Sequence, residues 1–390
     1  MEKPSRAVVL LAKRSLPVVL FFSLLYVFLK RSMPASPALP LVQRPPPVRS
    51  KSPAPPHHSP PPFNKELDNQ IEYEFIPFLR LYKSGRVERF YGTTVVPPGD
   101  DPYTGVVSKD VVIDPETGLS ARLYLPKEVM TETEKKGAKL PVLLYFHGGA
   151  FVIESAFSPS YHAYLNLLVS KAKIVAVSVN YRLAPEHPLP VAYDDSWVAL
   201  KWVSSNCRSG PDPWLAGHGD TGHIFLAGDS AGGNIAHNLA VRAGRDGLER
   251  ETRIKGLALL NPYFWGKDPV GSEPKERWIR EELERSWRFV CGGSMGIEHP
   301  SVDPTAAVEL WRKVACERVM VTVAGRDFFR ERGVAYADGL RRSGWKGEVE
   351  LYETAGEVHV YFLSNLGSEK AAKEMEAVVM FLNRDRVGFA

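Results

Sequence analysis

The chain has 390 residues, of which 44% are hydrophobic, 24% charged and 11% aromatic, so it is neither disordered as a whole nor a small disulfide scaffold. Its net charge of +4 is unevenly distributed, because residues 1–64 contribute +8 and residues 65–390 contribute −4. An acidic body without a basic stripe argues against nucleic acid as a partner, since phosphate binding needs clustered Lys and Arg.

A hydrophobic leader occupies residues 1–33. Its apolar run, Leu16–Leu29, holds fourteen uncharged residues between basic pairs, fewer than the roughly 20 that a membrane-spanning helix needs. Three interpretations stay open: a membrane anchor, a cleaved secretory signal, and a transit peptide. The first two favour a membrane or the secretory pathway, with plastid or cytoplasm as alternatives. Any membrane association is expected to run through this apolar segment.

A proline-rich segment follows at residues 34–64, and 12 of the 29 residues from Pro34 to Pro62 are proline. Such a segment lacks backbone donors and favours extended polyproline II geometry, which predicts a semi-rigid linker. The three cysteines, Cys207, Cys291 and Cys316, are too widely spaced for a metal site and odd in number. We expect free thiols that are buried or partly buried.

Residues 65–390 alternate short apolar runs with amphipathic stretches, which predicts an α/β fold: a mostly parallel central sheet with helices on both faces. Helices are expected at Ser158–Ser170 and Val191–Ser205. Residues 66–105 and 262–300 depart from the alternation and are interpreted as cap segments over the strand ends, with peripheral helices as the alternative. The predicted strands are Val106–Ile113, Leu119–Leu125, Pro141–Phe146, Lys173–Asn180, Ile224–Ala227, Ile254–Leu260, Val319–Ala324 and Glu348–Tyr352.

The strongest chemical signal is a Gly228-x-Ser230-x-Gly232 sequence between an apolar strand and a helix. Glycines at both ends permit a sharp strand-to-helix turn, which exposes the serine oxygen in a strained conformation. Ser230 is therefore predicted to be a nucleophile.

A serine nucleophile needs a base, and three histidines follow Ser230 in the chain. His237 lies inside the helix after the turn, and His299 lies in an irregular segment. His359 follows the predicted strand EVELYET and is the best-placed base.

The base needs an acid to orient it. Asp327 comes just after the apolar strand that ends at Ala324, whereas Asp303 follows no strand and Asp338 lies within a helical pattern. The order Ser230, Asp327, His359 is the chain order of the α/β-hydrolases.

An oxyanion hole is expected after the strand PVLLYF, in the segment HGGAF. The backbone amides of Gly148 and Gly149, together with that of Ala231 after the nucleophile, are predicted to bind the developing alkoxide. Ala150 is a further candidate donor, and His147 is interpreted as a residue that braces the loop.

Three segments together resemble the plant carboxylesterases of the hormone-sensitive-lipase group: HGGAF at His147, VNYRLAPEHPLPVAYDDSWVALKWV from Val179, and GDSAGGNIAH from Gly228. The resemblance covers roughly residues 70–385 and implies an α/β-hydrolase fold with a helical cap. It assigns the same roles of nucleophile, base, orienting acid and oxyanion donors to Ser230, His359, Asp327, Gly148, Gly149 and Ala231. One departure is Ala150, where the family often has a third glycine.

The main hypothesis is a serine carboxylesterase that hydrolyses small to medium carboxylic esters through an acyl-enzyme, without a metal or cofactor. A lyase or lactone-forming transferase on the same site is the alternative, because hydroxyisoflavanone dehydratases and tuliposide-converting enzymes belong to the resembling group. A hormone receptor is less favoured, since the gibberellin receptors of this group lack the catalytic histidine and this chain has His359. A small-molecule ester is the expected partner.

Overall fold

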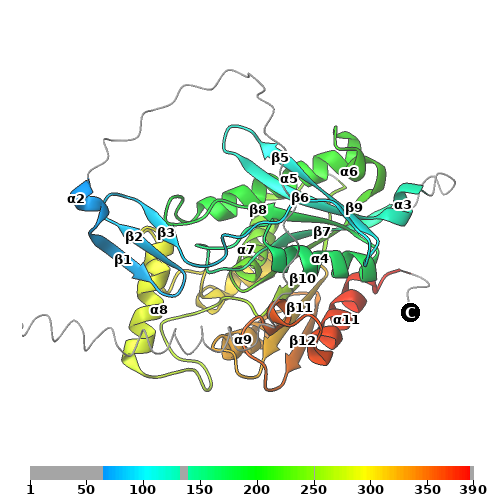
Figure 1. Cartoon of the computed structure of the whole chain (residues 1–390). Coiled ribbons are helices and arrows are strands. Elements are labelled where there is room, and N and C mark those ends of the chain that lie inside the picture. The colour runs from blue at the N-terminus through cyan, green and yellow to red at the C-terminus, as the bar shows by residue number, and fades with distance from the viewer. Residues whose placement is uncertain (1–64, 132–138, 250, 387–390) are drawn as a thin grey trace, which may run out of the picture. The chain divides into compact units, whose positions relative to one another are not determined.

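The computed structural model describes residues 65–131, 139–249 and 251–386 (Figure 1). The predicted leader and proline-rich linker lie outside these residues. No helix among the described residues combines the length and apolar character of a bilayer span. The chain divides into two compact units, Met1–Arg89 and Phe90–Ala390.

The described part of the first unit is a small antiparallel sheet. A short helix, α2 (Lys65–Asp68), is followed by β1 (Ile71–Phe75), β2 (Leu79–Tyr82) and β3 (Val87–Arg89), in the sheet order β1-β2-β3. The Asp68 carboxylate accepts a hydrogen bond from Arg86 Nε at 2.8 Å, which links the end of α2 to the residue before β3. This part of the expected cap is therefore mostly strand.

The second unit is built on a nine-stranded sheet in the order β12-β11-β10-β9-β7-β8-β6-β5-β4. The strands from β12 to β8 pair in parallel, whereas β6, β5 and β4 extend the sheet in antiparallel fashion. The strands are β4 (Asp100–Asp101), β5 (Val106–Asp114), β6 (Leu119–Pro126), β7 (Leu140–Phe146), β8 (Val175–Asn180), β9 (Gly219–Asp229), β10 (Ile254–Leu260), β11 (Arg318–Ala324) and β12 (Glu348–Thr354).

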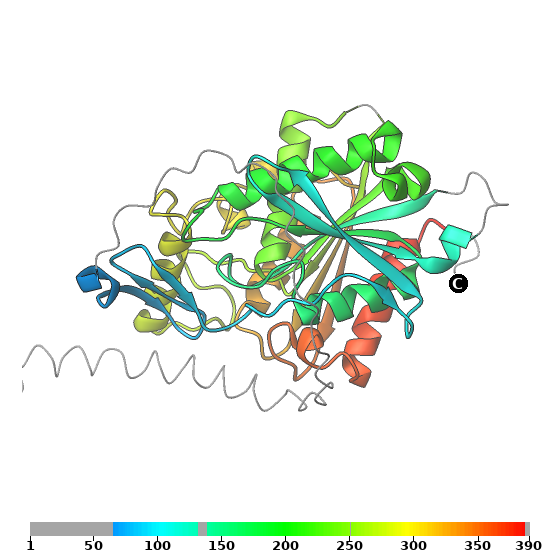
Figure 2. The ribbon, with the colours of Figure 1, turned by 45° about the horizontal axis from the view of Figure 1, so that its top comes forward.

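Helices cover both faces of this sheet, as the sequence predicts. In Figure 2 the twisted sheet runs between α5, in green above, and α11, in red below. The larger helices α4 and α11 pack on one face, and α5, α7 and α9 pack on the other. The helices are α3 (Lys127–Thr131), α4 (Pro159–Ala172), α5 (Val191–Ser209), α6 (Pro213–His218), α7 (Ala231–Asp246), α8 (Arg277–Val290), α9 (Arg330–Arg342), α10 (Tyr361–Ser364) and α11 (Glu369–Asn383), with short 3-10 helices at Pro304–Ala306 and Val308–Lys313.

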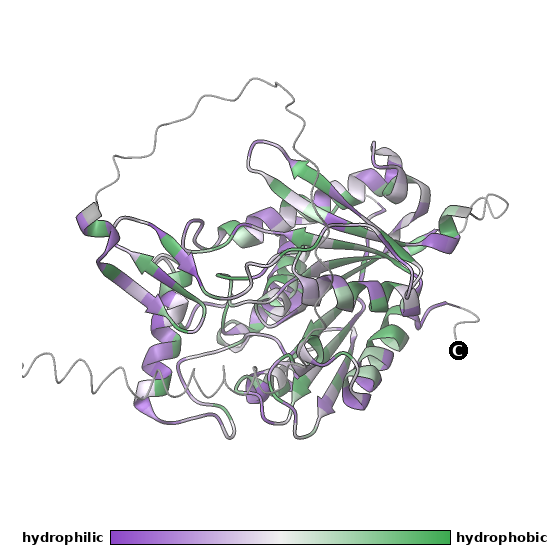
Figure 3. Cartoon of the chain, in the orientation of Figure 1, coloured by the Kyte–Doolittle hydropathy of each residue, from purple (hydrophilic) through white to green (hydrophobic). Residues whose placement is uncertain are grey.

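The central strands lack the alternation of polar and apolar residues that is typical of a sheet with one solvent-exposed face. Every residue of β7 and β11 is buried, because helices cover both faces. Figure 3 shows these strands as the hydrophobic centre of the unit, while the helices show mixed polar and apolar surfaces.

The eight predicted strands are all present, and the predicted fold class is confirmed. Most bounds agree within two residues; β9 begins five residues earlier and ends two residues later than predicted. The strands β1, β2 and β3 and the two-residue strand β4 were not predicted. Within residues 262–300 the structure has one helix, α8, which presents Trp287 to the interior with 0% exposure.

The parallel register aligns the strand ends that carry the predicted site. Phe146 pairs with Gly228, Asp229 with Leu260, and Leu260 with Thr322. Ala324 pairs with Thr354 at the far side. The loops after β7, β9, β11 and β12 consequently leave the sheet at one edge.

Candidate active site

Ser230 sits in a strained turn between β9 and α7. Its backbone has φ 50° and ψ −117°, a conformation that a residue with a side chain rarely adopts. The turn is held by hydrogen bonds from Ser230 N to Leu260 O at 3.0 Å and from Tyr263 N to Ser230 O at 2.8 Å. The residue is 7% exposed, so a small part of it remains accessible.

The two glycines around Ser230 are required by close packing. A Cβ on Gly228 would lie 2.5 Å from Phe146 O, and a Cβ on Gly232 would lie 1.8 Å from the same oxygen. The end of β7 therefore packs directly against the serine turn, which only glycine at both positions permits.

His359 and Asp327 are brought together by the loops after β12 and β11. Nδ1 of His359 lies 2.8 Å from Oδ2 of Asp327, while Oδ1 of Asp327 accepts the amide hydrogen of Phe329 at 2.9 Å. The Asp327 side chain is 1% exposed and that of His359 is 22% exposed. The carboxylate is thus fixed from two sides, and the imidazole keeps one accessible edge.

The charge on His359 depends on two carboxylates. Burial by itself lowers the pKa of His359, but the Asp327 carboxylate and its hydrogen bond outweigh burial, and the charge of Asp229 adds to them. The net effect raises the pKa of His359 above its ordinary value. The arrangement therefore stabilises the imidazolium that a general base becomes when it accepts a proton.

The loop after β7 is also strained. Gly149 has φ 97°, Ala150 φ 52° and Phe151 φ 65°, three consecutive left-handed residues. Gly149 O accepts from the amides of Val152 and Ile153, and Phe151 O accepts from Ala184 N, which holds the turn. Backbone strain of this kind clusters at functional sites.

The amides of this loop differ in their availability. The N–H of Gly148 donates to Tyr161 Oη at 2.9 Å and to Asp229 Oδ1 at 3.1 Å. Among the residues that the structure describes, the amides of Gly149 and Ala150 have no protein acceptor, and Ala231 N is the first amide of α7. Gly148, predicted as an oxyanion donor, is thus already engaged.

An aromatic wall, composed of Phe151, Tyr263, Trp287 and Phe329, lies beside the histidine. The Phe329 ring lies 5.2 Å from the His359 ring, and Tyr263 lies 4.9 Å from Phe329. Phe151 and Trp287 contact Tyr263 at 6.1 and 6.4 Å. None of these four residues was predicted to belong to the site, although each follows a strand end or belongs to α8.

Three other histidines, His237, His299 and His147, have structural contacts. His237 is buried, which lowers its pKa to about 3, and its Nδ1 lies 3.1 Å from Tyr336 Oη. His299 Nδ1 accepts the amide hydrogen of Ser301. The buried ring of His147 stacks on Tyr181 at 4.2 Å, and burial lowers its pKa to about 4, which agrees with a bracing role.

The two weaker candidates for the orienting acid also have structural contacts. Asp303 caps the 3-10 helix at Pro304–Ala306, and Asp338 pairs with Arg341 at 2.9 Å. In the described ranges, no group of three or more His, Cys, Asp or Glu side chains is placed to hold a metal ion.

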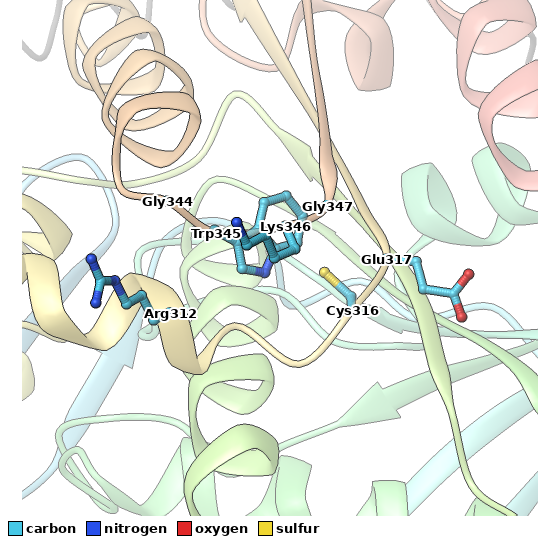
Figure 4. A pocket seen from close by; sticks show the side chains of 7 residues that line it. All are labelled: Arg312, Cys316, Glu317, Gly344, Trp345, Lys346 and Gly347. Carbon is cyan, nitrogen blue, oxygen red and sulfur yellow. The ribbon is translucent and has the colours of Figure 1, made fainter.

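A cavity of about 470 Å³ lies away from this site (Figure 4). Glu317 precedes β11 and Gly347 precedes β12, so the cavity opens at the amino ends of strands whose carboxyl ends lead to Asp327 and His359. It is lined by Arg312, Cys316, Glu317, Gly344, Trp345, Lys346 and Gly347.

Comparison with known proteins identifies the family of this chain. Residues 143–363 match a family model described as an alpha/beta hydrolase fold. "Probable carboxylesterase 2" of Arabidopsis thaliana is 45% identical over 317 residues, covering 81% of this chain and 97% of the relative. "Tuliposide A-converting enzyme 2, chloroplastic" of Tulipa gesneriana is 45% identical over 336 residues, covering 85% of this chain and 83% of the relative. Among solved structures, a thermostable carboxylesterase cloned from a metagenomic library is 25% identical, with a TM-score of 0.58 over 74% of this chain and 90% of that one.

Proposed function

Because the chain belongs to the α/β-hydrolase family that includes the plant carboxylesterases, we propose that it hydrolyses small to medium carboxylic esters through an acyl-enzyme on Ser230. The observation that carries the proposal is the 2.8 Å contact between His359 Nδ1 and Asp327 Oδ2, at the same sheet edge as the strained turn of Ser230. A serine hydroxyl needs a base that a third group orients, and this contact supports His359 and Asp327 in those two roles.

In the proposed reaction Ser230 Oγ attacks the ester carbonyl while Nε2 of His359 takes the hydroxyl proton. The contact with Asp327 supports this assignment, because a proton on Nδ1 leaves Nε2 as the acceptor. The tetrahedral intermediate then expels the alcohol, to which His359 returns the proton. Water, deprotonated by the same Nε2, releases the acid from Ser230 in the second half of the reaction.

For the oxyanion hole we propose the amides of Gly149, Ala150 and Ala231. The engagement of Gly148 N with Tyr161 and Asp229 supports replacing Gly148 by Ala150 in the predicted set. Alanine donates its amide as glycine does, so the departure from three glycines does not remove a donor.

The substrate class is proposed from the aromatic wall. Phe329 lies next to His359, and Tyr263 lies next to Phe329. This favours compact or planar groups at the reacting centre, because the buried Tyr263 ring cannot move aside without loss of packing. We propose that α8, which carries Trp287, forms part of a cap over the site.

The test is labelling of the purified protein with a fluorophosphonate probe, which reacts covalently with activated serines. The wild type should be labelled, and Ser230→Ala should lose both labelling and p-nitrophenyl ester turnover, the latter by roughly 10⁴-fold or more. Ser343→Ala removes a hydroxyl that donates to Leu340 O at the end of α9, and it should retain both. A folded wild-type protein without labelling would contradict the proposal.

Product analysis separates hydrolysis from its alternative. A lyase or lactone-forming transferase would use the same His359 but would release an unsaturated or cyclic product instead of the free acid. Free acid as the main product, with one equivalent of alcohol, supports the esterase.

We also propose that residues 1–33 direct the chain to a membrane or an organelle, joined by the proline-rich residues 34–64 to the hydrolase. The basic flanks of Leu16–Leu29 support the proposal. Carbonate extraction of a membrane fraction tests the anchor: full-length protein released into the supernatant would contradict it.

A further inference from the structure

Asp229, the residue before the nucleophile, is a buried carboxylate with three donors around it. It is 1% exposed. Oδ1 accepts from Tyr145 Oη at 2.9 Å and from Gly148 N at 3.1 Å, and Oδ2 accepts from Tyr161 Oη at 2.9 Å. These contacts join β7, β9, α4 and the loop after β7 at one point.

We propose that Asp229 is a positioning residue whose carboxylate, with Tyr145 and Tyr161, fixes the loop of Gly149 and Ala150 against the turn of Ser230. The inference rests on the proposed function, because the two segments are those that would supply the oxyanion donors and the nucleophile. Asp229 acts on the reaction through them and does not touch the substrate.

Steric contact supports this role. A Cβ on Gly148 would lie 2.3 Å from Asp229 Oδ2 and 3.0 Å from Asp229 O, so the loop backbone packs directly on the carboxylate. Position 148 therefore needs glycine because the side chain of Asp229 occupies the adjacent space.

The backbone on both sides of the contact between Asp229 and Gly148 is strained. Ala150 and Phe151 on one side, and Ser230 on the other, all have left-handed φ values. Such conformations persist only where the surroundings hold them. Since Asp229 is bonded to the chain beside Ser230 and hydrogen-bonded to Gly148, its loss would let both turns relax relative to each other.

The charge of Asp229 has a second effect. Burial raises the pKa of Asp229 to about 6, while the hydrogen bonds from Tyr145 and Tyr161 oppose burial and favour the ionised form. The ionised carboxylate raises the pKa of His359. The titratable groups facing Asp229 are Tyr145 from β7, Tyr161 and Tyr164 from α4, Tyr181 after β8, and His359 after β12.

The principal test is Asp229→Asn, which removes the charge and keeps the size. We expect kcat for p-nitrophenyl acetate to fall about 10²-fold, the loss associated with misplacement of reacting groups by about 1 Å. KM should change by less than about threefold, because ground-state binding is not targeted. The acid limb of the kcat/KM profile should move to lower pH, since His359 loses a stabilising charge.

Two tyrosine variants make the test specific. Tyr161→Phe removes an acceptor of Gly148 N–H and one donor to Asp229 but leaves the carboxylate, so it should lower kcat about 10-fold and move the acid limb less than Asp229→Asn does. Tyr124→Phe is the matched control. Tyr124 is a buried tyrosine on β6 whose hydroxyl contacts His162 on α4 and does not contact Asp229. It should retain the wild-type kcat.

The outcomes are distinguishable. An active wild type with unchanged kcat and pH profile in folded Asp229→Asn would overturn the positioning role alone. If Asp229→Asn does not fold, wild-type kcat in Tyr161→Phe would overturn it instead. A folded wild type that is neither labelled by a fluorophosphonate nor active would overturn the proposed function and this inference together.

Discussion

The imidazole of His359 meets the carboxylate of Asp327 at 2.8 Å, although 32 residues separate them in the chain. Each follows a strand, and β11 and β12 pair in parallel from Arg318 with Glu348 to Ala324 with Thr354. The contact is therefore a product of strand register. A shift of one residue between these strands would separate the pair.

Asp327→Asn tests the role of this contact. If the remaining oxygen keeps the amide hydrogen of Phe329, the new NH2 group faces Nδ1 of His359 and donates to it, so the imidazole is expected to adopt the wrong tautomer. Ester turnover should fall by about 10⁴-fold with the fold intact. Steady-state kinetics with a p-nitrophenyl ester measures the effect, and a loss below about tenfold would contradict the assignment of Asp327.

The pH dependence of the wild type follows from His359. Its pKa is raised because the Asp327 carboxylate and hydrogen bond outweigh burial, and the base works only when neutral. The kcat/KM profile for an uncharged ester should thus fall as pH decreases through a value above the ordinary histidine pKa of about 6.5. An acid limb centred well below that value would show that another group controls the rate.

Much of the candidate site could be predicted because Ser230, Asp327 and His359 each follow a strand that the sequence predicts. These strands are β9, β11 and β12. Ile224 to Asp229 of β9 and all of β11 are buried, whereas β12, the last strand in the sheet order, carries glutamates between its apolar residues and is mostly half-buried. In parallel sheets such positions meet at one edge, so the sequence order carries three-dimensional information.

The state of the Gly148 amide could not be predicted in the same way. Its partners are the hydroxyl of Tyr161 on α4 and the carboxylate of Asp229, and both depend on side-chain direction after folding. The approach of Phe329 to His359, and of Tyr263 to Phe329, depends on loops in which no periodic pattern exists. Strand β4 has only two residues and leaves no hydrophobic pattern.

Gly232→Ala should destabilise the protein strongly. The added Cβ would lie 1.8 Å from Phe146 O, which is backbone and cannot move aside without displacing β7. We expect the free energy of unfolding to decrease by about 3 kcal/mol or more. Gly217→Ala on α6 is the control, since nothing lies within 4 Å of its Cβ position. Equal urea midpoints for the two variants would contradict the packing argument.

A buried ion pair beneath α8 gives a further prediction. Arg332 Nε lies 2.6 Å from Glu273 Oε1, with side-chain exposures of 3% and 0%. Arg332→Met leaves the Glu273 carboxylate without this partner and should decrease the free energy of unfolding by about 3–5 kcal/mol. Denaturant titration followed by tryptophan fluorescence measures the change.

The matched control for that experiment is Arg277→Met. Arg277 pairs with Glu281 at 2.6 Å on α8, but the side chains are 90% and 59% exposed. Because solvent screens such a pair, the unfolding midpoint should stay nearly unchanged. Comparable losses of unfolding free energy in both variants would mean that burial does not decide how much an ion pair contributes to stability.

The order of the strands has a consequence for how activity arises in time. The positions of Gly149, Ser230, Asp327 and His359 depend on β7, β9, β11 and β12. Some strands that are neighbours in the sheet are not neighbours in the chain. Pairing strands that are distant in sequence requires closing long loops, which slows folding. Helical content can therefore recover before the strand ends are aligned, and ester hydrolysis during refolding should lag behind it. The time course of ester turnover during refolding thus reports when the sheet is complete.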